Sequence, residues 1–469
     1  MDSHNLCGCG LPSSERGLRT MRTLAAKHVE RHSTGRIEIA RGSWAAGCLT
    51  LTLGLLPAGA SAQSTEVSVR NPVTWQQVKA RFAVTNPTLK AAQLGIDESR
   101  AAEITAFLRP NPDFSLASDG TQLTRYNGIW RPFAGTQFTT SLNYLHERQH
   151  KRELRRLSAR ESTSIAESTY LDQQRGLLFN LRTAFVQTLE AKAVLENAKQ
   201  NLEYWDRELG VNRNRMNAGD LAQIDLGRME LQRVQFESDF ETAVVNLRTA
   251  KTQLLLLLNE RTPIEEFDIS GPFDFAEELP SLEQFRREAL EARPDVQVAI
   301  RNVELAKINH QLAIANASTD PTFSGWWTHN PSFNNPYDYN TVGASLTIPL
   351  RIFDRNQGEK ARTLIDIGRN ERLRDASEAQ VYGDVDSAYY TLVQNLNLLR
   401  PYKTKYLTLA LDIRNRMTIA YQNGGASLLD YLDAEKSYRD TRLAYLNLIG
   451  SYLSAAAQMN MAVGREVVE

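Results

Sequence analysis

Two stretches of this sequence repeat one pattern: MNAGDLAQIDLGRME at residues 216–230 and YQNGGASLLDYLDAE at residues 421–435. They lie 205 residues apart (421 minus 216), and at this spacing Gly219 matches Gly424. Three further identities share the spacing: Asp225 with Asp430, Glu230 with Glu435, and Ala250 with Ala455. A repeat of this length indicates a structural unit that the chain contains twice. A glycine between two helical segments predicts the turn of a helical hairpin.

Two short stretches of strand character precede each hairpin. In VGASLTIPLRI, Val342 and Leu346 point one way and Ser345 points the other, as the alternation of a half-buried strand requires. The four expected strands are residues 111–119, 136–146, 321–329 and 341–351. Strands of about 9 to 11 residues can cross a bilayer when tilted, but four of them cannot close a barrel without exposed edges. Either several chains contribute strands, or the strands are not in a membrane.

The long segments around each glycine turn read as helices of unusual length. Between residues 151 and 216 there is no proline, and apolar residues recur at steps of three and four. About 65 helical residues would extend over about 100 Å, so neighbouring helices must cover them along their length, as in a coiled-coil bundle. The expected long helices are residues 151–215, 220–259, 356–420 and 426–463.

The sequence thus predicts a mainly α-helical protein with a small β part. Its expected domains are a signal peptide at residues 1–62, a first repeat at residues 63–269 and a second repeat at residues 270–469. The signal peptide is indicated by an apolar run at residues 44–60 that follows two arginines and ends in a small-x-small site before Gln63. Because this leader is long, Met21 is an alternative start.

All three cysteines (Cys7, Cys9 and Cys48) fall in the expected leader. A mature chain without cysteine needs no oxidative folding and offers no thiolate for metal binding or catalysis. Cys48 also allows a lipoprotein reading, but a lipidated cysteine would end the apolar run, whereas Cys48 lies near its beginning.

Composition and motifs argue against nucleic-acid binding and against an enzyme. Lys plus Arg (54) nearly balance Asp plus Glu (55), so no global field attracts a polyanion. The chain has no glycine-rich phosphate loop and no G-x-S-x-G motif. One protease-like motif, HERQH at residues 146–150, fits H-E-x-x-H, yet Lys151, Arg152, Arg155 and Arg156 follow it. We therefore expect a solvated basic junction there rather than a zinc site.

The duplication, the strand pair in each half and the tract YQNGGASLLDYLDAEKSY resemble the TolC family of outer-membrane efflux proteins over nearly the whole mature chain. Within that family, IPLRIFDRNQGEKA at residues 348–361 is most similar to the CzcC-like subgroup of heavy-metal efflux systems. The resemblance implies a homotrimer in which each chain gives four strands to a twelve-stranded outer-membrane β-barrel, continued into the periplasm by an α-helical barrel. A closed trimer would leave no strand edge exposed to lipid.

The resemblance also implies a gate at the periplasmic end. Asp430 and Asp433, one helical turn apart, would form an acidic entrance ring that favours cations. Tyr421 and Asp225 match family positions whose hydrogen bonds hold the closed state. Ala426 stands where other members have an arginine, so an arginine lock is not expected here. The hairpin turns would be formed by Gly219, Gly424 and Gly425.

The implied function is the exit duct of a tripartite efflux pump that works with a periplasmic adaptor protein and an inner-membrane RND-type transporter. No cofactor, resident metal or reaction is implied, and Trp326 and Trp327 would anchor the strands at the lipid interface. A heavy-metal duct is expected; a multidrug or type I secretion duct is an alternative. A periplasmic coiled-coil scaffold is an alternative of another class, but it does not explain strands that recur with the repeat.

Overall fold

The computed structural model describes residues 72–125, 127–133, 135–330 and 340–468. The expected signal peptide lies outside these residues. Residues 66–469 form one compact unit, to which all the described residues belong.

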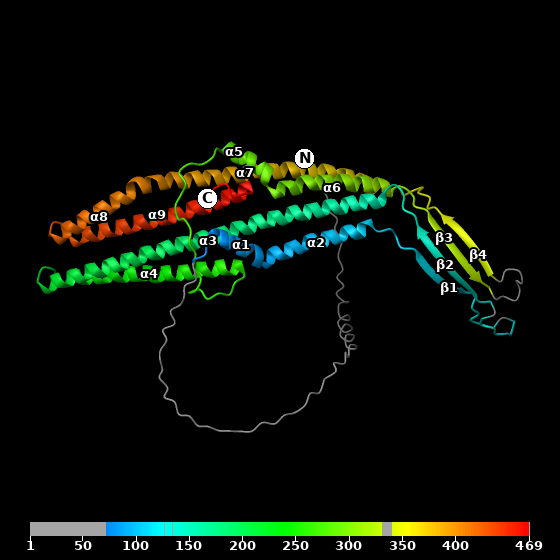
Figure 1. Cartoon of the computed structure of the whole chain (residues 1–469), viewed down its shortest axis with the longest axis horizontal. Helices are drawn as coiled ribbons and strands as arrows, with labels where there is room; N and C mark the ends of the chain where they lie inside the picture. The colour runs from blue at the N-terminus through cyan, green and yellow to red at the C-terminus, as the bar shows by residue number, and fades with distance from the viewer. Residues whose placement is uncertain (1–71, 126, 134, 331–339, 469) are drawn as a thin grey trace, which may run out of the picture. The chain divides into compact units, whose positions relative to one another are not determined.

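Two long helical hairpins make up most of the unit (Figure 1). The first consists of α3 (Lys151–Asn217) and α4 (Gln223–Leu258). The second consists of α7 (Gln357–Pro401), the π-helical turn η1 (Tyr402–Tyr406), α8 (Leu407–Gln422) and α9 (Leu428–Val463). The helix ends around the two turns keep the spacing of the sequence repeat, since Asn217 and Gln422, Gln223 and Leu428, and Leu258 and Val463 each differ by 205.

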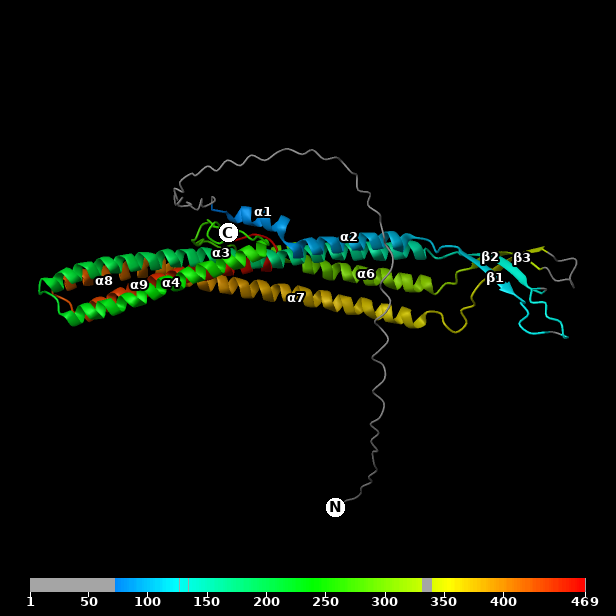
Figure 2. The same ribbon diagram turned by 90° about the horizontal axis from the view of Figure 1, so that it is seen from below.

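Four shorter helices precede the strands: α1 (Trp75–Thr85), α2 (Pro87–Phe107), α5 (Leu282–Ala292) and α6 (Pro294–Asn316). Both α2 and α6 begin with proline, which suits the first helical position because no hydrogen bond is lost there. Asn86 caps α2 by accepting the backbone N–H of Leu89 at 3.0 Å. Figure 2 shows α2 alongside α3 and α6 alongside α7, and both pairs are in contact.

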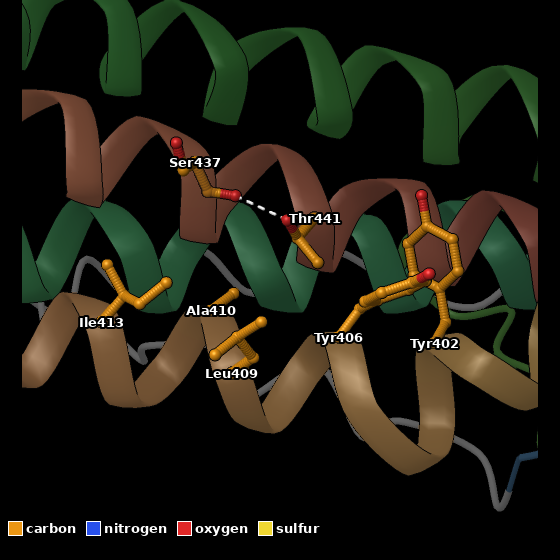
Figure 3. A pocket seen from close by; sticks show the side chains of 7 residues that line it. All are labelled: Tyr402, Tyr406, Leu409, Ala410, Ile413, Ser437 and Thr441. Carbon is orange, nitrogen blue, oxygen red and sulfur yellow. Dashed lines mark hydrogen bonds between the residues drawn. The ribbon is translucent and has the colours of Figure 1, made fainter.

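The segment expected as one helix over residues 356–420 is interrupted after residue 401, about two-thirds of the way along it. Pro401 ends α7, and the five residues of η1 follow it. Proline supplies no N–H, so one hydrogen bond of the helix is lost at this point, and the π turn absorbs the irregularity. Beyond it, a pocket of about 250 Å³ opens between α8 and α9, lined by Tyr402, Tyr406, Leu409, Ala410, Ile413, Ser437 and Thr441 (Figure 3).

The strands form one antiparallel sheet in the order β1-β2-β3-β4. They are β1 (Asp113–Asp119), β2 (Gln137–Leu145), β3 (Thr322–His329) and β4 (Asn340–Thr347). The expected extension of the last strand to residue 351 is wrong: β4 ends at Thr347, two residues before Pro349, which has no N–H to give to a ladder.

The register places apolar side chains on one face of this sheet. Phe114 pairs with Leu142, which pairs with Gly325, and Trp327 pairs with Val342, so all five residues share a face. The opposite face carries mainly hydroxyl and amide side chains, such as Ser115, Thr139, Ser141, Asn143, Ser324, Thr328, Thr341 and Ser345. The apolar residues are exposed, with 70% for Phe114, 55% for Leu142 and 83% for Val342. Within the described part of the chain, nothing covers that face.

The two adjacent tryptophans lie on opposite faces of the sheet. Trp327 is on the apolar face, in agreement with a lipid-facing anchor, whereas Trp326 is on the polar face over Gly343, where a Cβ atom would come within 2.3 Å of the indole. Only Trp327 therefore lies where the expected interface anchor requires.

The HERQH motif lies where β2 hands over to α3, and it is not helical. His150 has a left-handed conformation (φ 54°), and Glu147 pairs with Arg155 at 2.8 Å, so this glutamate is not placed beside two histidines of one helix turn. Among the described residues no group of three or more His, Cys, Asp or Glu side chains could hold a metal ion.

The expectation of a solvated basic junction is wrong for Lys151, whereas Arg152 is partly covered and Arg156 is exposed as expected. Lys151 is 4% exposed and binds Asp320 at 2.6 Å, which ties the start of α3 to the start of β3. Arg152 and Arg156 both lie over the ring of Phe107, at 4.3 and 4.6 Å from its centroid. The junction is therefore a packed joint between helix and sheet.

None of the described helices has an apolar stretch long enough to cross a bilayer.

Candidate functional site

The turns of the two hairpins lie side by side at the end of the unit away from the sheet (Figure 1). A small core joins all four helices there, formed by Trp205, Leu209, Leu226, Met229, Phe236, Tyr421, Leu428 and Tyr431. We call this cluster the tip core. It lies at the end where the sequence predicts the entrance of the channel.

A stack of three aromatic rings runs through the tip core from one hairpin to the other. Tyr431 of α9 lies between Trp205 of α3 and Tyr421 of α8, with ring centroids 6.1 and 5.0 Å away and nearly parallel planes. Trp205 also donates its indole N–H to the carbonyl of Met229 in α4 at 3.0 Å. Because the stack is fully buried at Trp205 and Tyr431, it fixes the two hairpins against each other.

The turns themselves need glycine at one position each. Gly219 and Gly424 have φ values of +90° and +74°, a left-handed conformation that side chains other than glycine adopt at a cost. Gly425 has no such φ, so its flexibility is not required by the backbone. The amide of Gly425 donates to the carbonyl of Ala420 at 2.7 Å, which closes the end of α8.

The two expected entrance residues are both exposed on the first turns of α9. Asp430 is engaged in a capping box: Ser427 donates its hydroxyl to Asp430 at 2.7 Å, and the Ser427 backbone N–H does so at 3.2 Å. These hydrogen bonds lower the pKa of Asp430, so it is charged at neutral pH. Asp433 lies one turn further and is free of the cap. Both carboxylates thus face away from the protein's own core.

Tyr421 and Asp225 lie near each other, but no hydrogen bond joins them among the described residues. Asp225 pairs with Arg228 at 3.4 Å, and the buried hydroxyl of Tyr421 has no hydrogen-bond partner in the described part of the chain. Burial raises the pKa of the Tyr421 phenol; the positive charge of Arg215 opposes this, and the negative charge of Asp225 adds to it. The hydrogen-bonded closed state remains a prediction. Ala426 packs against the tip core, so an apolar contact takes the arginine's place.

One group at the tip has a role that the sequence did not indicate. Glu435, on α9, is only 5% exposed and accepts a hydrogen bond from the Tyr204 hydroxyl of α3 at 3.0 Å. Its counterpart in the repeat, Glu230, is exposed and pairs with Arg213 at 3.0 Å. The two glutamates occupy equivalent positions of the repeat, and the sequence around them does not indicate that one of them is buried.

These features define a class of protein: a duplicated helical hairpin with a one-sided β-sheet is the fold of outer-membrane efflux channels. The chain matches the family described as outer membrane efflux protein over residues 285–465. It is a channel protein of the TolC, CzcC and CusC type and not an enzyme.

Individual relatives agree with this assignment. The cobalt-zinc-cadmium resistance protein CzcC of Cupriavidus metallidurans is 22% identical, over 84% of this chain and 90% of its own length. The outer membrane protein TolC of Escherichia coli is 24% identical, over 83% and 81%. The crystal structure of CusC superimposes with a TM-score of 0.70 at 18% identity, over 85% of this chain and 96% of CusC.

Proposed function

We propose that three copies of this chain form the outer-membrane exit duct of a tripartite efflux pump and that the duct exports heavy-metal cations. The main support for this proposal is the sheet. It has one exposed apolar face and one polar face, and the outer edges of β1 and β4 pair with no other described strand. An unpaired edge is not tolerated in lipid, whereas a closed ring of such sheets satisfies every edge. Three sheets of four strands give a twelve-stranded barrel with its apolar face toward lipid and its polar face toward a lumen.

The helices would continue this duct into the periplasm. The hairpin tips then form the entrance, where a periplasmic adaptor protein and an inner-membrane RND-type transporter would deliver the substrate. The preference for heavy metals is supported by the similarity to a cobalt-zinc-cadmium resistance protein. The comparable identity to TolC favours the second candidate, a multidrug or type I secretion duct.

Deletion of the gene in its host tests the substrate. Loss of the duct should make cells sensitive to cobalt, zinc or cadmium while leaving sensitivity to dyes and detergents near normal; the reverse pattern would favour the multidrug duct. Soluble periplasmic monomers, instead of trimers in the outer-membrane fraction, would overturn the duct altogether.

The proposed gate is the ring of Asp430 and Asp433, which would place six carboxylates around the axis of a trimer. Their mutual repulsion favours bound cations at this point. Replacing both residues by asparagine removes the charge, and asparagine can still accept a hydrogen bond from Ser427 as a cap does. The double variant should still trimerise, but in planar bilayers it should lose cation selectivity and block by a trivalent cation.

Ser427→Ala is the matched control, because it weakens the cap of α9 and keeps both carboxylates. It should leave selectivity and block unchanged. If the double variant keeps the selectivity and block of the natural protein, the two aspartates are not at the constriction.

A further inference from the structure

The carboxyl group of Glu435 lies at the contact between the two hairpins. It is on α9, and the hydroxyl that donates to it, that of Tyr204, is on α3 at 3.0 Å. This is a direct hydrogen bond from the first hairpin to the second in the region of the tip core. Any movement that separates α9 from α3 near this point must break it and expose Glu435 to water.

Few titratable or charged groups face this carboxyl. From α3 they are Tyr204 and Glu208, and from α8 the guanidinium of Arg414, which lies over the Tyr204 ring at 5.1 Å. Tyr431 of α9 is buried beside it with its hydroxyl unpaired. Within the described part of the chain, no cation comes within 4.0 Å of the Glu435 carboxylate. The negative charge of an ionised Glu435 would therefore be poorly compensated.

The repeat shows why no cation pairs directly with Glu435. In the first hairpin, Glu230 is neutralised by Arg213 of the preceding helix. Adding the spacing of 205 to Arg213 gives position 418, and this residue is Thr418, which is uncharged. The second copy thus keeps the glutamate, buries it, and lacks its arginine.

We propose that Glu435 is a proton-operated latch between the two hairpins: the protonated carboxyl holds α9 against α3, and loss of its proton admits water and loosens that contact. The inference concerns the packing of the hairpins and goes beyond the export function, because it holds whatever the duct carries.

The direction of the pH effect follows from the environment of Glu435. Burial raises its pKa from an ordinary value of 4.5 to about 7; the hydrogen bond from Tyr204 and the charge of Arg414 oppose this, and Glu208 adds to it. A raised pKa means that the packed state binds the proton more tightly than the separated state does. The stabilisation of the packed state by this proton is complete below pH 4.5 and is lost as the pH rises through about 7.

The neighbouring phenols do not interfere in this range. Burial and the nearby glutamates raise the pKa of Tyr204 to about 12 and also raise that of Tyr431, so both remain protonated. Glu208 is half-buried, and burial raises its pKa too. It is the one other group facing the latch whose titration has to be separated from that of Glu435.

Trp205 reports on the contact directly, since it is fully buried and stacked on Tyr431. The probe is the full-length mature protein in detergent, with the other four tryptophans after the leader (Trp75, Trp130, Trp326 and Trp327) replaced by phenylalanine. We expect acrylamide quenching of Trp205 to rise with pH, with a midpoint near 7. In Glu435→Gln, which mimics the protonated carboxyl, quenching should stay at its low-pH value throughout.

Three further variants make the assignment specific. Tyr204→Phe removes a hydrogen bond that favours the carboxylate, so it should move the midpoint to higher pH. Glu203→Gln, an exposed neighbour on α3, should leave the midpoint unchanged. Glu208→Gln should shift the midpoint slightly downward but keep the transition, because it removes a repelling charge.

The proposal is overturned if Glu435→Gln, shown by circular dichroism to be folded, keeps the transition near pH 7. It is equally overturned if Glu208→Gln alone abolishes the transition. Neither result would bear on whether the protein is an export duct, because fluorescence is read without transport.

Discussion

The first hairpin and the second hairpin come from one duplicated unit, yet they differ within the first long arm of each. α3 is continuous over 67 residues, whereas the equivalent stretch of the second copy is divided by Pro401 into α7, a π turn and α8. The position equivalent to Pro401 in the first copy (401 minus 205) is Glu196, an ordinary helical residue. At this position of the repeat, proline coincides with a break in the long helix, and glutamate lies within a continuous one.

The joint is held by contacts with the connecting segment between α4 and α5. Lys403 in η1 lies over the ring of Phe275 at 4.7 Å, and Arg400 donates to the carbonyl of Glu277 at 2.6 Å. The connecting segment thus clamps the break. Duplication has preserved the helix ends and the turns, whereas the long helix is interrupted in one copy only.

The largest expected effect is at the contact between the hairpins. Trp205→Ala should lower the free energy of unfolding of the tip by about 3–5 kcal/mol, because it leaves a cavity in a core shared by all four helices. Hydrogen exchange at residues 200–235 and 425–440 measures this. Trp205→Phe is the control and should cost less, since an aromatic ring remains. Equal exchange in all three proteins would mean that the two tips do not depend on each other.

A proline exchange between the copies tests the joint. Glu196→Pro should destabilise α3 by about 3 kcal/mol, because this helix has no π turn to absorb the lost hydrogen bond. Pro401→Ala should change stability little and slow hydrogen exchange at η1, since the helix can then continue. Glu196→Ala controls for loss of the side chain. Thermal unfolding distinguishes the variants. If Glu196→Pro leaves the melting temperature unchanged, both copies tolerate proline at this position.

The turns are expected to be alike in the two copies. Gly219→Ala and Gly424→Ala should each cost about 1–2 kcal/mol, because both need a left-handed backbone and neither has an atom within 4 Å of the added Cβ. Gly425→Ala should cost clearly less, as its φ is not positive. Chemical denaturation of the three variants checks this order. If Gly425→Ala lowers the free energy of unfolding as much as the other two, the left-handed backbone is not the reason that the turns need glycine.

The helix starts after the turns differ by one cap. α9 begins with the capping box of Ser427 and Asp430, whereas the N-cap of α4 is Ala222, which offers no side-chain cap, although Asp225 stands where Asp430 does. Ala222→Ser should therefore stabilise α4 by about 1 kcal/mol, and Ser427→Ala should destabilise α9 by a similar amount. Opposite changes in melting temperature are the expected result. If both substitutions change the melting temperature in the same direction, the side-chain caps do not determine the stability of these helix ends.

The sequence predicts the repeat, the helix ends at the turns and the alternation of the strands, because these features depend on local periodicity and on glycine. The charged residues that follow HERQH argue against a zinc site from the sequence alone. The interruption at Pro401 was missed, although proline is a local signal, because the apolar pattern continues on both sides of it. The end of β4 was placed too late for the same reason, since Ile348 and Leu350 extend the alternation past Pro349.

The spacing of residues along the chain is enough to predict a duplicated helical hairpin with four one-sided strands and an acidic turn. Only the packing of distant helices shows that Trp205, Tyr431 and Tyr421 stack across the hairpins, that Lys151 is buried against Asp320, and that Glu435 is buried while Glu230 is not. Burial depends on which residues of a distant helix lie opposite. For Glu435 that neighbour is Tyr204, more than two hundred positions away, and no local pattern records it.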